Sequence, residues 1–396
     1  MKILHLVTSL NGGAGIAARR IVNAQIVNGM NSQLGAANGR PRNLMSHEMI
    51  LPKSPLRKLE SKAVTFAQTN FVQSGNLLVT PFTISILSSS KDLIESSDIV
   101  HIHSFYNMLN LKDISRLAQN KKIFVTLHDE RFYTGGCHYT CGCEGYRSGC
   151  FKCPQVKGLA RRFPTVSIKS AINAWSDTNG VTFIAPSKWL AEKARESPLI
   201  EKSNVEFISN PVPPEFFVSR NTMANSHSSH QNVLNVGFIS ENLNNPYKGI
   251  EILRNALRHI GDRKAINLKL FGSGSPGDFP SNTSVETRKF ENSKDAQKAI
   301  SECDLIVVPS KQDNSPSVVA ESLMCGVPVL GSRVGGVSET LHEFGLPTFE
   351  SENVLDLATQ ILNFTPLKLS EEVMKQVMKK YAYETSASKH RQLYEK

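Results

Sequence analysis

Several features that mark whole classes of protein are missing from this sequence of 396 residues. No apolar run approaches the roughly 18 residues that a helix needs to cross a bilayer. Aromatic residues make up only 7% of the chain and no paired histidines follow zinc-finger spacing, which argues against a nucleic-acid-binding protein. No tandem repeat occurs, and residues 1–10 are typical of a strand and loop, without a cleavable signal. With 40% hydrophobic residues, the sequence predicts a soluble, cytoplasmic protein of two or three domains.

The positive charge is unevenly distributed. Up to residue 205 the chain has 25 Lys and Arg against 13 Asp and Glu, and the rest has 20 against 22, so the net +10 (12 minus 2) comes from the first half. Such a half either meets an acidic partner or only carries a solubilising surface. An anionic membrane surface or a lipid-pyrophosphate is the favoured partner, and nucleic acid ranks last. The basic stretch at residues 53–62 shows no clean amphipathic stripe and is interpreted as a solvated helix.

Short apolar runs rich in β-branched residues alternate with helical stretches along the whole chain, which predicts α/β domains with parallel sheets. The Pro-rich stretch at residues 210–214 (NPVPP) is the best boundary between domains, and a polar loop is expected at 219–231. We therefore expect a first domain over residues 1–209 and a second over residues 210–375. Residues 370–395 are expected to be helical, and the C-terminal helix over 376–396 is expected to return to the first domain. Strands are expected at 2–8, 33–38, 98–104, 123–129, 181–188, 205–209, 232–239, 267–271, 303–308 and 328–330.

A strand and a helix are predicted around residue 313, and they organise the second domain. Residues 303–308 (CDLIVV) are typical of a buried parallel strand. Ser315 is a good N-cap and Pro316 suits the first helical position, so a helix is expected over 318–325. The free N–H groups at the start of that helix favour a phosphate outside the carboxyl edge of the sheet.

Two carboxylates flank the start of this helix. Asp313 precedes it, and Glu321 lies one turn inside it, eight positions later. Both can reach one ligand, and carboxylates, which only accept hydrogen bonds, suit the hydroxyl donors of ribose and hexose rings. The alternative is an acid at a helix N-terminus plus a solvated helical Glu.

The pattern Asp313-x7-Glu321, followed by CGVPV and two glycines, resembles the E-x7-E signature of the retaining glycosyltransferase family 4. The sequence departs from that signature by Asp in place of the first Glu. The resemblance implies a GT-B fold, α/β with two Rossmann-like domains facing a cleft. It also implies that Glu321 holds the ribose of a nucleotide-sugar donor and that Asp313 lies by the transferred sugar. No metal is then required for catalysis, in keeping with the lack of a D-x-D sequence.

Other expected donor contacts follow from the same resemblance. Lys248, in a Lys-Gly pair, should neutralise the donor pyrophosphate, and Phe238 stands where an Arg is common. The alternative for Lys248 is a surface lysine at a helix start, and the alternative for the glycine loop at 11–15, expected to precede a helix over 16–30, is tight packing. The nucleotide base is expected near residues 285–290. The remaining donor-side residues are Gly13, Gly15, Gly274, Ser315, Ser317 and Val318.

Two histidines follow predicted strands of the first domain. His103 ends the strand at 98–104, and His128 ends the strand at 123–129, next to Asp129. The carboxyl ends of parallel strands form the ligand side of a sheet, although a lone His is most often a structural hydrogen-bonding residue. The LHD sequence resembles the family position whose His contacts the donor sugar. The resemblance thus implies that His128 acts on the sugar, with His103 and Asp129 on the acceptor side.

Residues 134–155 (TGGCHYTCGCEGYRSGCFKCPQ) contain five of the seven cysteines. Four thiolates, Cys137, Cys143, Cys150 and Cys153, could hold a structural zinc, with Cys141 spare and His138 as a substitute ligand. Free thiols and redox or disulfide chemistry are the alternatives. The block resembles one in a subgroup of family 4 transferases from bacterial capsule, exopolysaccharide and O-antigen clusters.

The resemblance therefore implies transfer of a sugar from a nucleotide-sugar to a hydroxyl of a glycan or undecaprenyl-linked acceptor. Peripheral contact with the inner face of an anionic plasma membrane is part of this expectation, and nucleic acid is not. Three alternatives stay open: a non-catalytic nucleotide-sugar-binding protein, a nucleotide-sugar 2-epimerase, and a zinc-dependent regulatory protein.

Overall fold

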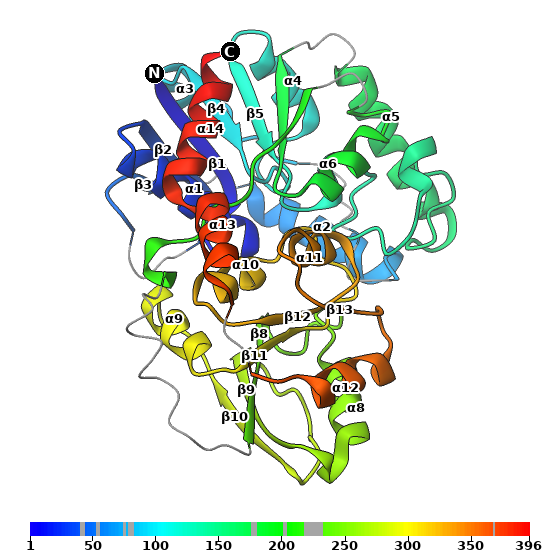
Figure 1. The fold of residues 1–396 in the computed structure, drawn as a ribbon. Helices are drawn as coiled ribbons and strands as arrows, with labels where there is room; N and C mark the ends of the chain where they lie inside the picture. Colours follow the sequence, from blue (N-terminus) through cyan, green and yellow to red (C-terminus); the bar gives the residue numbers. More distant parts are fainter. Residues whose placement is uncertain are drawn as a thin grey trace. The chain divides into compact units, whose positions relative to one another are not determined.

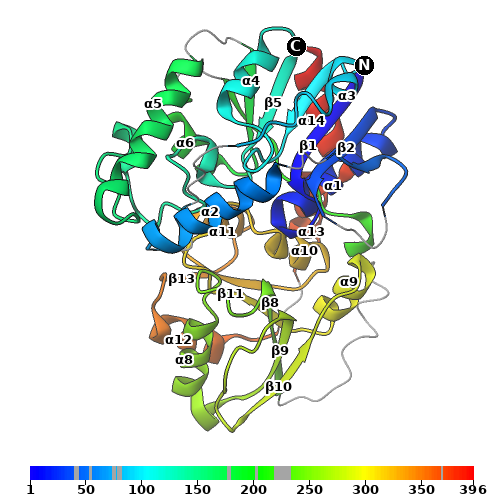
Figure 2. The same ribbon diagram turned by 180° about the vertical axis from the view of Figure 1, so that it is seen from behind.

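A computed structural model describes residues 1–39, 44–52, 56–73, 77, 83–175, 180–200, 204–217, 233–366 and 369–396. The expected polar loop at 219–231 and Lys53 lie outside these residues. The chain divides into two compact units, which Figures 1 and 2 show from opposite sides. Unit 1 comprises Met1–Pro211 and Ser386–Lys396, and unit 2 comprises Val212–Thr385. The sequence placed the corresponding boundaries at 209 and 375. None of the described helices is long and apolar enough to cross a membrane.

Unit 1 is built on a seven-stranded parallel sheet in the order β3-β2-β1-β4-β5-β6-β7. The chain begins in the middle of this sheet, runs outward to β3, and then returns to β4 on the other side of β1. The carboxyl ends of β1 and β4 therefore flank the point at which the strand order reverses, where ligands bind in open α/β sheets. The strands are β1 Lys2–Ser9, β2 Asn31–Asn38, β3 Glu48–Ile50, β4 Ile99–Ile102, β5 Lys122–Thr126, β6 Val181–Ala185 and β7 Asn204–Phe207.

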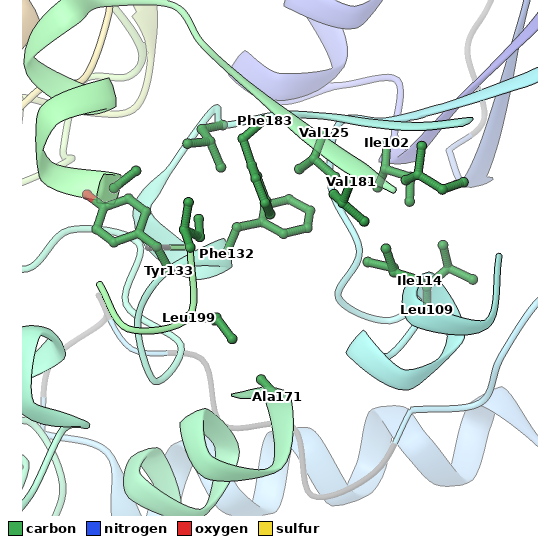
Figure 3. Packing of buried hydrophobic residues seen from close by; sticks show 14 of the residues in the cluster. Ile102, Leu109, Ile114, Val125, Phe132, Tyr133, Ala171, Val181, Phe183 and Leu199 are labelled. Atoms are coloured by element: carbon green, nitrogen blue, oxygen red, sulfur yellow. The ribbon is translucent and has the colours of Figure 1, made fainter. Parts of the chain in front are cut away.

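Helices cover both faces of this sheet because alternate strand residues point to opposite sides. Leu4, Val100 and Val125 pack into the larger core, which Figure 3 shows with Phe132, Phe183 and residues of α4 and α5. On the opposite face, Ile3 packs near α14. The helices are α1 Gly12–Val27, α2 Arg57–Phe71, α3 Lys91–Glu95, α4 Leu111–Ala118, α5 Phe163–Trp175, α6 Lys188–Arg195 and α14 Tyr383–Glu395, with short 3-10 helices η1 Glu130–Phe132, η2 Gly145–Ser148 and η3 Gly158–Arg162.

Unit 2 contains a six-stranded parallel sheet in the order β10-β9-β8-β11-β12-β13. Its strand order reverses between β8 and β11. The strands are β8 Val233–Asn242, β9 Ala265–Ser273, β10 Thr283–Arg288, β11 Leu305–Val308, β12 Val329–Ser332 and β13 Thr348–Phe349. Two buried clusters lie on the two faces of the sheet. The helices are α8 Ile250–Ile260, α9 Ser293–Ser301, α10 Ser317–Met324, α11 Gly335–Glu343, α12 Val354–Asn363 and α13 Glu371–Tyr381, with 3-10 helices η4 Pro214–Phe216 and η5 Gly261–Arg263.

Two expected helices differ from those observed. The helix expected at 16–30 begins earlier, at Gly12, so the glycines of the supposed loop lie in its first turn. The helical stretch expected over 370–395 is two helices, α13 and α14, because Ala382 between them has extended backbone (φ −60°, ψ 148°). This break lets the chain leave unit 2 before α14 continues in unit 1.

Candidate active site

The loops at the switch point of unit 2 bring together two of the predicted residues. Lys248 lies in the loop after β8, and Asp313 lies in the loop after β11. Lys248 Nζ donates to Asp313 Oδ2 at 2.5 Å, and the Asp313 side chain is 8% exposed. The backbones of the two loops are also joined, since Lys311 N donates to Tyr247 O at 2.8 Å. A cation and an anion are thus held at the crevice where open α/β sheets bind ligands.

Helix α10 begins at Ser317, three residues after Asn314 in the loop that carries Asp313. The predicted N-cap, Ser315, is wrong: Pro316 occupies the cap position, with extended backbone (φ −69°, ψ 118°), and no side chain caps the helix. The cap residue of the helix therefore offers no side-chain acceptor to the first N–H groups. Helix N-termini of this kind attract anions. Glu321 lies in this helix and is 7% exposed.

Glycine at two positions lets these loops approach closely. Gly249 has φ of 77°, and a Cβ there would lie 1.8 Å from Pro309 O. Gly336, at the start of α11, donates from its N to Asp313 O at 3.0 Å, and a Cβ there would lie 2.0 Å from Asn314 O. The backbone around Asp313 is therefore packed on both sides by segments that tolerate no side chain.

The other glycines predicted for the donor site are divided between the units. Gly274 follows β9 at the carboxyl edge of the unit 2 sheet and has φ of 112°. Gly13 and Gly15 lie in α1 of unit 1. Nothing lies within 4 Å of a Cβ built at Gly13, whereas one at Gly15 would lie 2.4 Å from Ser9 O. Close packing of the helix against the end of β1 accounts for Gly15.

In unit 1 the predicted histidines are joined directly. His103 follows β4, His128 follows β5, and His103 Nδ1 lies 2.9 Å from His128 Nε2 in a hydrogen bond. His103 is 1% exposed and His128 is half-buried. Burial lowers the pKa of His128 to about 4, against the opposing effect of the Asp129 charge. At neutral pH His128 is therefore an uncharged imidazole.

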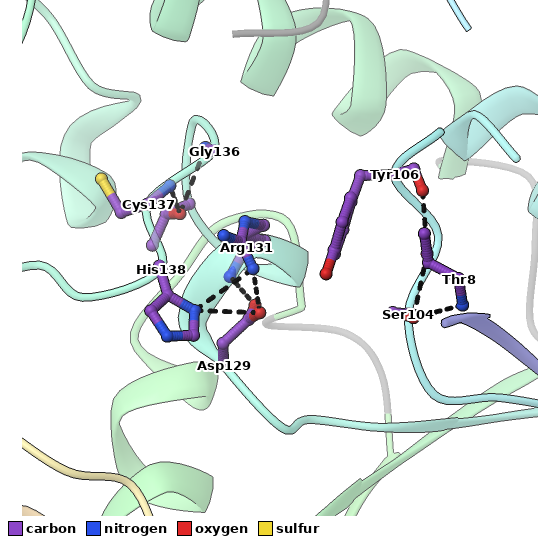
Figure 4. A network of polar contacts seen from close by, with 9 residues as sticks. Thr8, Ser104, Tyr106, Asp129, Arg131, Gly136, Cys137 and His138 are labelled. Atoms are coloured by element: carbon purple, nitrogen blue, oxygen red, sulfur yellow. Dashed lines mark hydrogen bonds and ion pairs between the residues drawn. The ribbon is translucent and has the colours of Figure 1, made fainter. Parts of the chain in front are cut away.

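Asp129 is held by a basic cluster that the sequence did not indicate (Figure 4). It accepts from the Arg131 guanidinium, and His138 Nδ1 lies 3.2 Å from its Oδ2. Burial favours the neutral acid, but the charge of Arg131 and the hydrogen bond from His138 outweigh it and hold the pKa of Asp129 well below its usual value. The Arg131 guanidinium also lies over the Tyr106 ring, 4.7 Å from its centroid. Sequence reasoning missed Arg131 and Tyr106 because neither stands in a recognisable motif.

A threonine and a serine tie the ends of β1 and β4 together near this cluster (Figure 4). Thr8 N donates to Ser104 Oγ at 2.8 Å, and Thr8 Oγ1 donates to Tyr106 O at 2.8 Å. These two hydrogen bonds join the end of β1 to the segment after β4, which also carries His103.

The four cysteines predicted to bind zinc share one neighbourhood. Cys137, Cys150 and Cys153 are buried, Cys143 is half-buried, and the spare Cys141 is exposed. Burial raises the pKa of the Cys150 thiol to about 11, and the charges of Cys153 and Cys143 raise it further. Tetrahedral zinc requires sulfurs about 3.8 Å apart, from a zinc–sulfur distance of about 2.3 Å. Among the described residues, no three of these sulfurs lie within 4.8 Å of one another. The sulfurs are therefore farther apart than the ligands of a tetrahedral zinc ion.

Helices α2 and α5 expose large apolar side chains. For the α2 region the sequence predicted only a solvated helix. Phe71 lies edge-on to both Phe66 and Phe163, at 6.0 and 6.3 Å between ring centroids. Leu59, Phe66 and Val166 are 60%, 62% and 60% exposed. We call these five residues the apolar patch. Lys62, Arg162 and Lys169 are exposed on the same two helices or at their ends.

Residues 232–365 match the family model described as "Glycosyl transferases group 1". We call residues 232–365 the group 1 domain after this match. They include Lys248, Asp313, Glu321 and the whole six-stranded sheet.

Two curated proteins are similar in sequence to parts of the chain. The putative colanic acid biosynthesis glycosyl transferase WcaC of Escherichia coli (strain K12) is 26% identical over 272 residues, which cover 65% of this chain and 65% of WcaC. The uncharacterized glycosyltransferase MJ1178 of Methanocaldococcus jannaschii is 29% identical over 162 residues, covering 38% of this chain and 45% of that protein. The matches thus span less than two thirds of each relative.

Solved structures match the chain along its whole length. Sucrose-phosphate synthase from Thermosynechococcus elongatus aligns with a TM-score of 0.65 at 16% identity, over 100% of this chain and 98% of that one. Anabaena Alr3699/HepE in complex with UDP and glucose aligns with a TM-score of 0.64 at 16% identity, over 100% and 99%. The predicted GT-B fold, with two parallel-sheet α/β domains, is confirmed.

Proposed function

We propose that this chain is a retaining glycosyltransferase of family 4 that moves a sugar from a nucleotide-sugar to a hydroxyl of a glycan or undecaprenyl-linked acceptor. The observation that carries the proposal is the Lys248–Asp313 pair at the switch point of the group 1 domain, next to the uncapped start of α10. The name of WcaC supports a role in bacterial surface polysaccharide biosynthesis, and the HepE complex with UDP and glucose supports a nucleotide-sugar donor.

The chemistry proposed for these residues follows from their charges. As the bond between the anomeric carbon and the pyrophosphate breaks, negative charge grows on the leaving phosphate. Lys248 and the N–H groups at the start of α10 stabilise that charge, with no metal required for catalysis. Glu321 holds the ribose hydroxyls, and Asp313 orients the transferred sugar, with His128 as a further sugar contact. The departing phosphate itself accepts the proton of the acceptor hydroxyl.

One observation favours a second candidate, a nucleotide-sugar-binding protein without turnover. Phe238, where relatives commonly carry an Arg, is 1% exposed in the core of unit 2, and Lys248 is already paired with Asp313. The donor phosphates would then meet less positive charge than in a transferase with both cations.

Release of free nucleotide from a UDP-, GDP- or ADP-sugar distinguishes these functions. Transfer predicts release that depends on an added polyprenyl-pyrophosphate-linked glycan fraction and that is lost in Glu321→Gln but kept in Glu291→Gln, a change at an exposed residue of the same unit. Equal release with and without acceptor would indicate an epimerase or hydrolase, and tight donor binding without release would indicate the binding protein.

We also propose that the apolar patch and its lysines and arginines contact an anionic membrane, where lipid-linked acceptors reside. Apolar side chains among cationic ones are the pattern of interfacial binding. Co-sedimentation with phosphatidylglycerol vesicles at low salt should fall in Phe66→Ser with Val166→Ser. Equal sedimentation of the variant, or none of the parent chain, would remove this part of the proposal.

A further inference from the structure

A cluster of histidines lies between the sheet of unit 1 and the C-terminal helix α14. His5 of β1 and His101 of β4 lie directly opposite each other in the sheet, and the ring of His103 stacks on that of His101 at 4.5 Å between centroids. His390 of α14 completes the cluster, with its ring centroid 5.8 Å from that of His101. All four side chains are at most 1% exposed. Unit 1 therefore buries four imidazoles under its last helix.

Tyr394 attaches α14 to this cluster. Its hydroxyl lies 2.6 Å from His101 Nδ1 and accepts from the Gln25 amide nitrogen at 3.1 Å. The amide oxygen of Gln25 in turn lies 2.8 Å from His5 Nε2. The Tyr394 ring also packs edge-on to Phe124, with 4.7 Å between centroids, in a buried apolar cluster. The helix is therefore held to the sheet by polar contacts that end on the histidines and by apolar packing beside them.

His390 has a ring nitrogen that can take up a proton but cannot share it. Its Nδ1 lies 2.8 Å from Ser386 O and must donate to it, because a carbonyl oxygen is only an acceptor. The neutral ring then carries its lone pair on Nε2, which is buried without a hydrogen-bond partner among the described residues. A proton bound there would create a buried positive charge beside His101 with no acceptor, which costs free energy for as long as α14 covers the sheet.

Burial and like charges keep these rings neutral. Burial lowers the pKa of His5 to about 3 and that of His390 to about 4, compared with about 6.5 for an exposed histidine. Burial is also the main cause that holds the pKa of His101 well below its ordinary value. The charges that act on the four rings lower the pKa further, and they are those of the other histidines of the cluster, His128 and Lys389.

The other charged groups that meet the C-terminal segment lie at its edges. Lys122 Nζ donates to a backbone carbonyl of α14 at 3.3 Å, and Arg391 donates to the carbonyl at the C-cap of α1 at 2.6 Å. Glu206 lies 3.9 Å from Lys396 Nζ at a solvent-exposed position, where screening leaves the carboxylate little effect on the buried rings. These edge groups are Asp98, Lys121, Lys122 and Glu206 and, on the segment itself, Glu384, Lys389, Arg391, Glu395 and Lys396.

We propose that α14 is an acid-sensitive latch, in which uptake of protons by His390 and His101 releases residues 386–396 from the sheet of unit 1. Release exposes both rings to water, so the released state binds protons below pH 6.5 that the attached state does not. Attachment is therefore favoured above pH 6.5 and is lost as the pH falls. The chain passes between the units after Pro211 and again after Thr385, so release leaves the link after Pro211 as the remaining covalent connection between the two folded units.

Hydrogen exchange of the full chain, followed by mass spectrometry and corrected for the intrinsic effect of pH, measures this release. Exposure of one histidine multiplies the opening constant about 30-fold between pH 8 and pH 5, and exposure of two multiplies it about 1000-fold. Protection of peptides from α14 should fall accordingly and should stay below that of β5 at both pH values. Protection that is independent of pH would overturn the proposal. So would equal protection of α14 and β5, because the helix would then leave only when unit 1 unfolds.

Variants separate proton uptake from attachment. Leucine binds no proton, so His390→Leu should reduce the change in α14 protection between pH 8 and pH 5 about 30-fold. The matched control is His259→Leu, at an exposed histidine of unit 2, which should keep the change seen in the parent chain. An undiminished change in His390→Leu would contradict the latch.

Tyr394→Phe provides a second test that leaves every histidine in place. It removes the hydroxyl that bonds to His101, so it should lower the protection of α14 by a similar factor at pH 8 and at pH 5 and keep the ratio between them. If the ratio disappeared in this variant, the tyrosine and not the histidines would be responsible for the pH dependence, and the proposal would fail.

Discussion

At the scale of the residue, the ion pair between Lys248 and Asp313 is the feature that most shapes the candidate donor site. The aspartate replaces the longer glutamate of the resembled signature, and its carboxylate lies 2.5 Å from Lys248 Nζ. A donor pyrophosphate that engages Lys248 must share the lysine with Asp313 or replace it. The three N–H donors of lysine allow such sharing.

Lys248→Met should therefore weaken binding of the cognate nucleoside diphosphate by about 10- to 100-fold, since a hydrogen bond to a charged group contributes about 1.5–3 kcal/mol. Calorimetric titration measures this change. Lys311→Met is the control, because Lys311 lies in the loop that carries Asp313 but pairs with Glu352 at an exposed site. Equal losses in the two variants would show that net charge, and not the position of Lys248, governs binding.

The buried histidines predict a stability that depends on pH. The pKa of His5 is lowered to about 3 and that of His390 to about 4 by burial, compared with about 6.5 in the unfolded chain. The unfolded state therefore binds more protons between pH 6.5 and 4, so the stability that these groups contribute is present above pH 6.5 and is lost as the pH falls. Each should contribute about 2 kcal/mol less at pH 5 than at pH 8.

Urea unfolding followed by tryptophan fluorescence measures this loss in unit 1, because both tryptophans, Trp175 and Trp189, belong to it. The exposed His259 of unit 2 serves as control, and His259→Asn should leave the pH dependence unchanged. An unfolding free energy for unit 1 that is equal at pH 8 and pH 5 would show that these histidines are not buried as neutral rings.

At the scale of the element, the cysteine block at residues 134–155 is the stretch whose structure the sequence predicted least completely. Spacing alone indicated a cluster, and the fold places Cys137, Cys150 and Cys153 in one buried neighbourhood with Cys143 nearby. Zinc binding would require the sulfurs to close in from their present separations, and it remains a prediction.

Metal analysis of the chain purified under reducing conditions, after equilibration with zinc and desalting, tests this prediction. One zinc per chain is expected for the parent chain and for Cys141→Ser, which changes an exposed thiol. Cys150→Ser should retain clearly less zinc than the parent chain, because the fourth position must then be filled by the spare Cys141 or by His138. Absence of zinc from the parent chain, or an undiminished zinc content in Cys150→Ser, would favour free thiols.

The elements themselves were largely predictable, and the exceptions have physical causes. Residues 305–308 form a strand as their β-branched run indicates, and α10 follows within one residue of its expected start. Ser315 failed as a cap because the backbone stays extended through Pro316. The long helix expected over 370–395 failed because helical periodicity continues across Ala382 although the chain passes from one unit to the other.

The polar residues at the two switch points also divide into those that could be identified from the sequence and those that could not. Lys248 and Asp313 could be identified from sequence because a motif and a strand end mark each of them. Gln25 and His5 could not, because a polar residue within an apolar strand or helix gives no signal of its partner. Their contacts depend on strand register and on the helices that cover the sheet, and only the folded chain supplies these.

At the scale of the whole molecule, two parallel sheets each present a switch point lined by polar side chains. In unit 1 these include His103, and in unit 2 they are Lys248 and Asp313. The six-stranded sheet of unit 2 positions the Lys248–Asp313 pair at its switch point. The proposed function therefore depends on the binding of a nucleotide-sugar by unit 2.

Thermal unfolding of the full chain against a panel of UDP-, GDP- and ADP-sugars tests this claim most directly. Saturation at about 100 times Kd adds about 2.7 kcal/mol, which for a chain of this size raises Tm by about 3 °C. We predict such a shift for one nucleotide class, lost in Glu321→Gln and retained in Glu291→Gln. No shift with any nucleotide-sugar, or a shift that Glu321→Gln leaves intact, would contradict the assignment of the donor site.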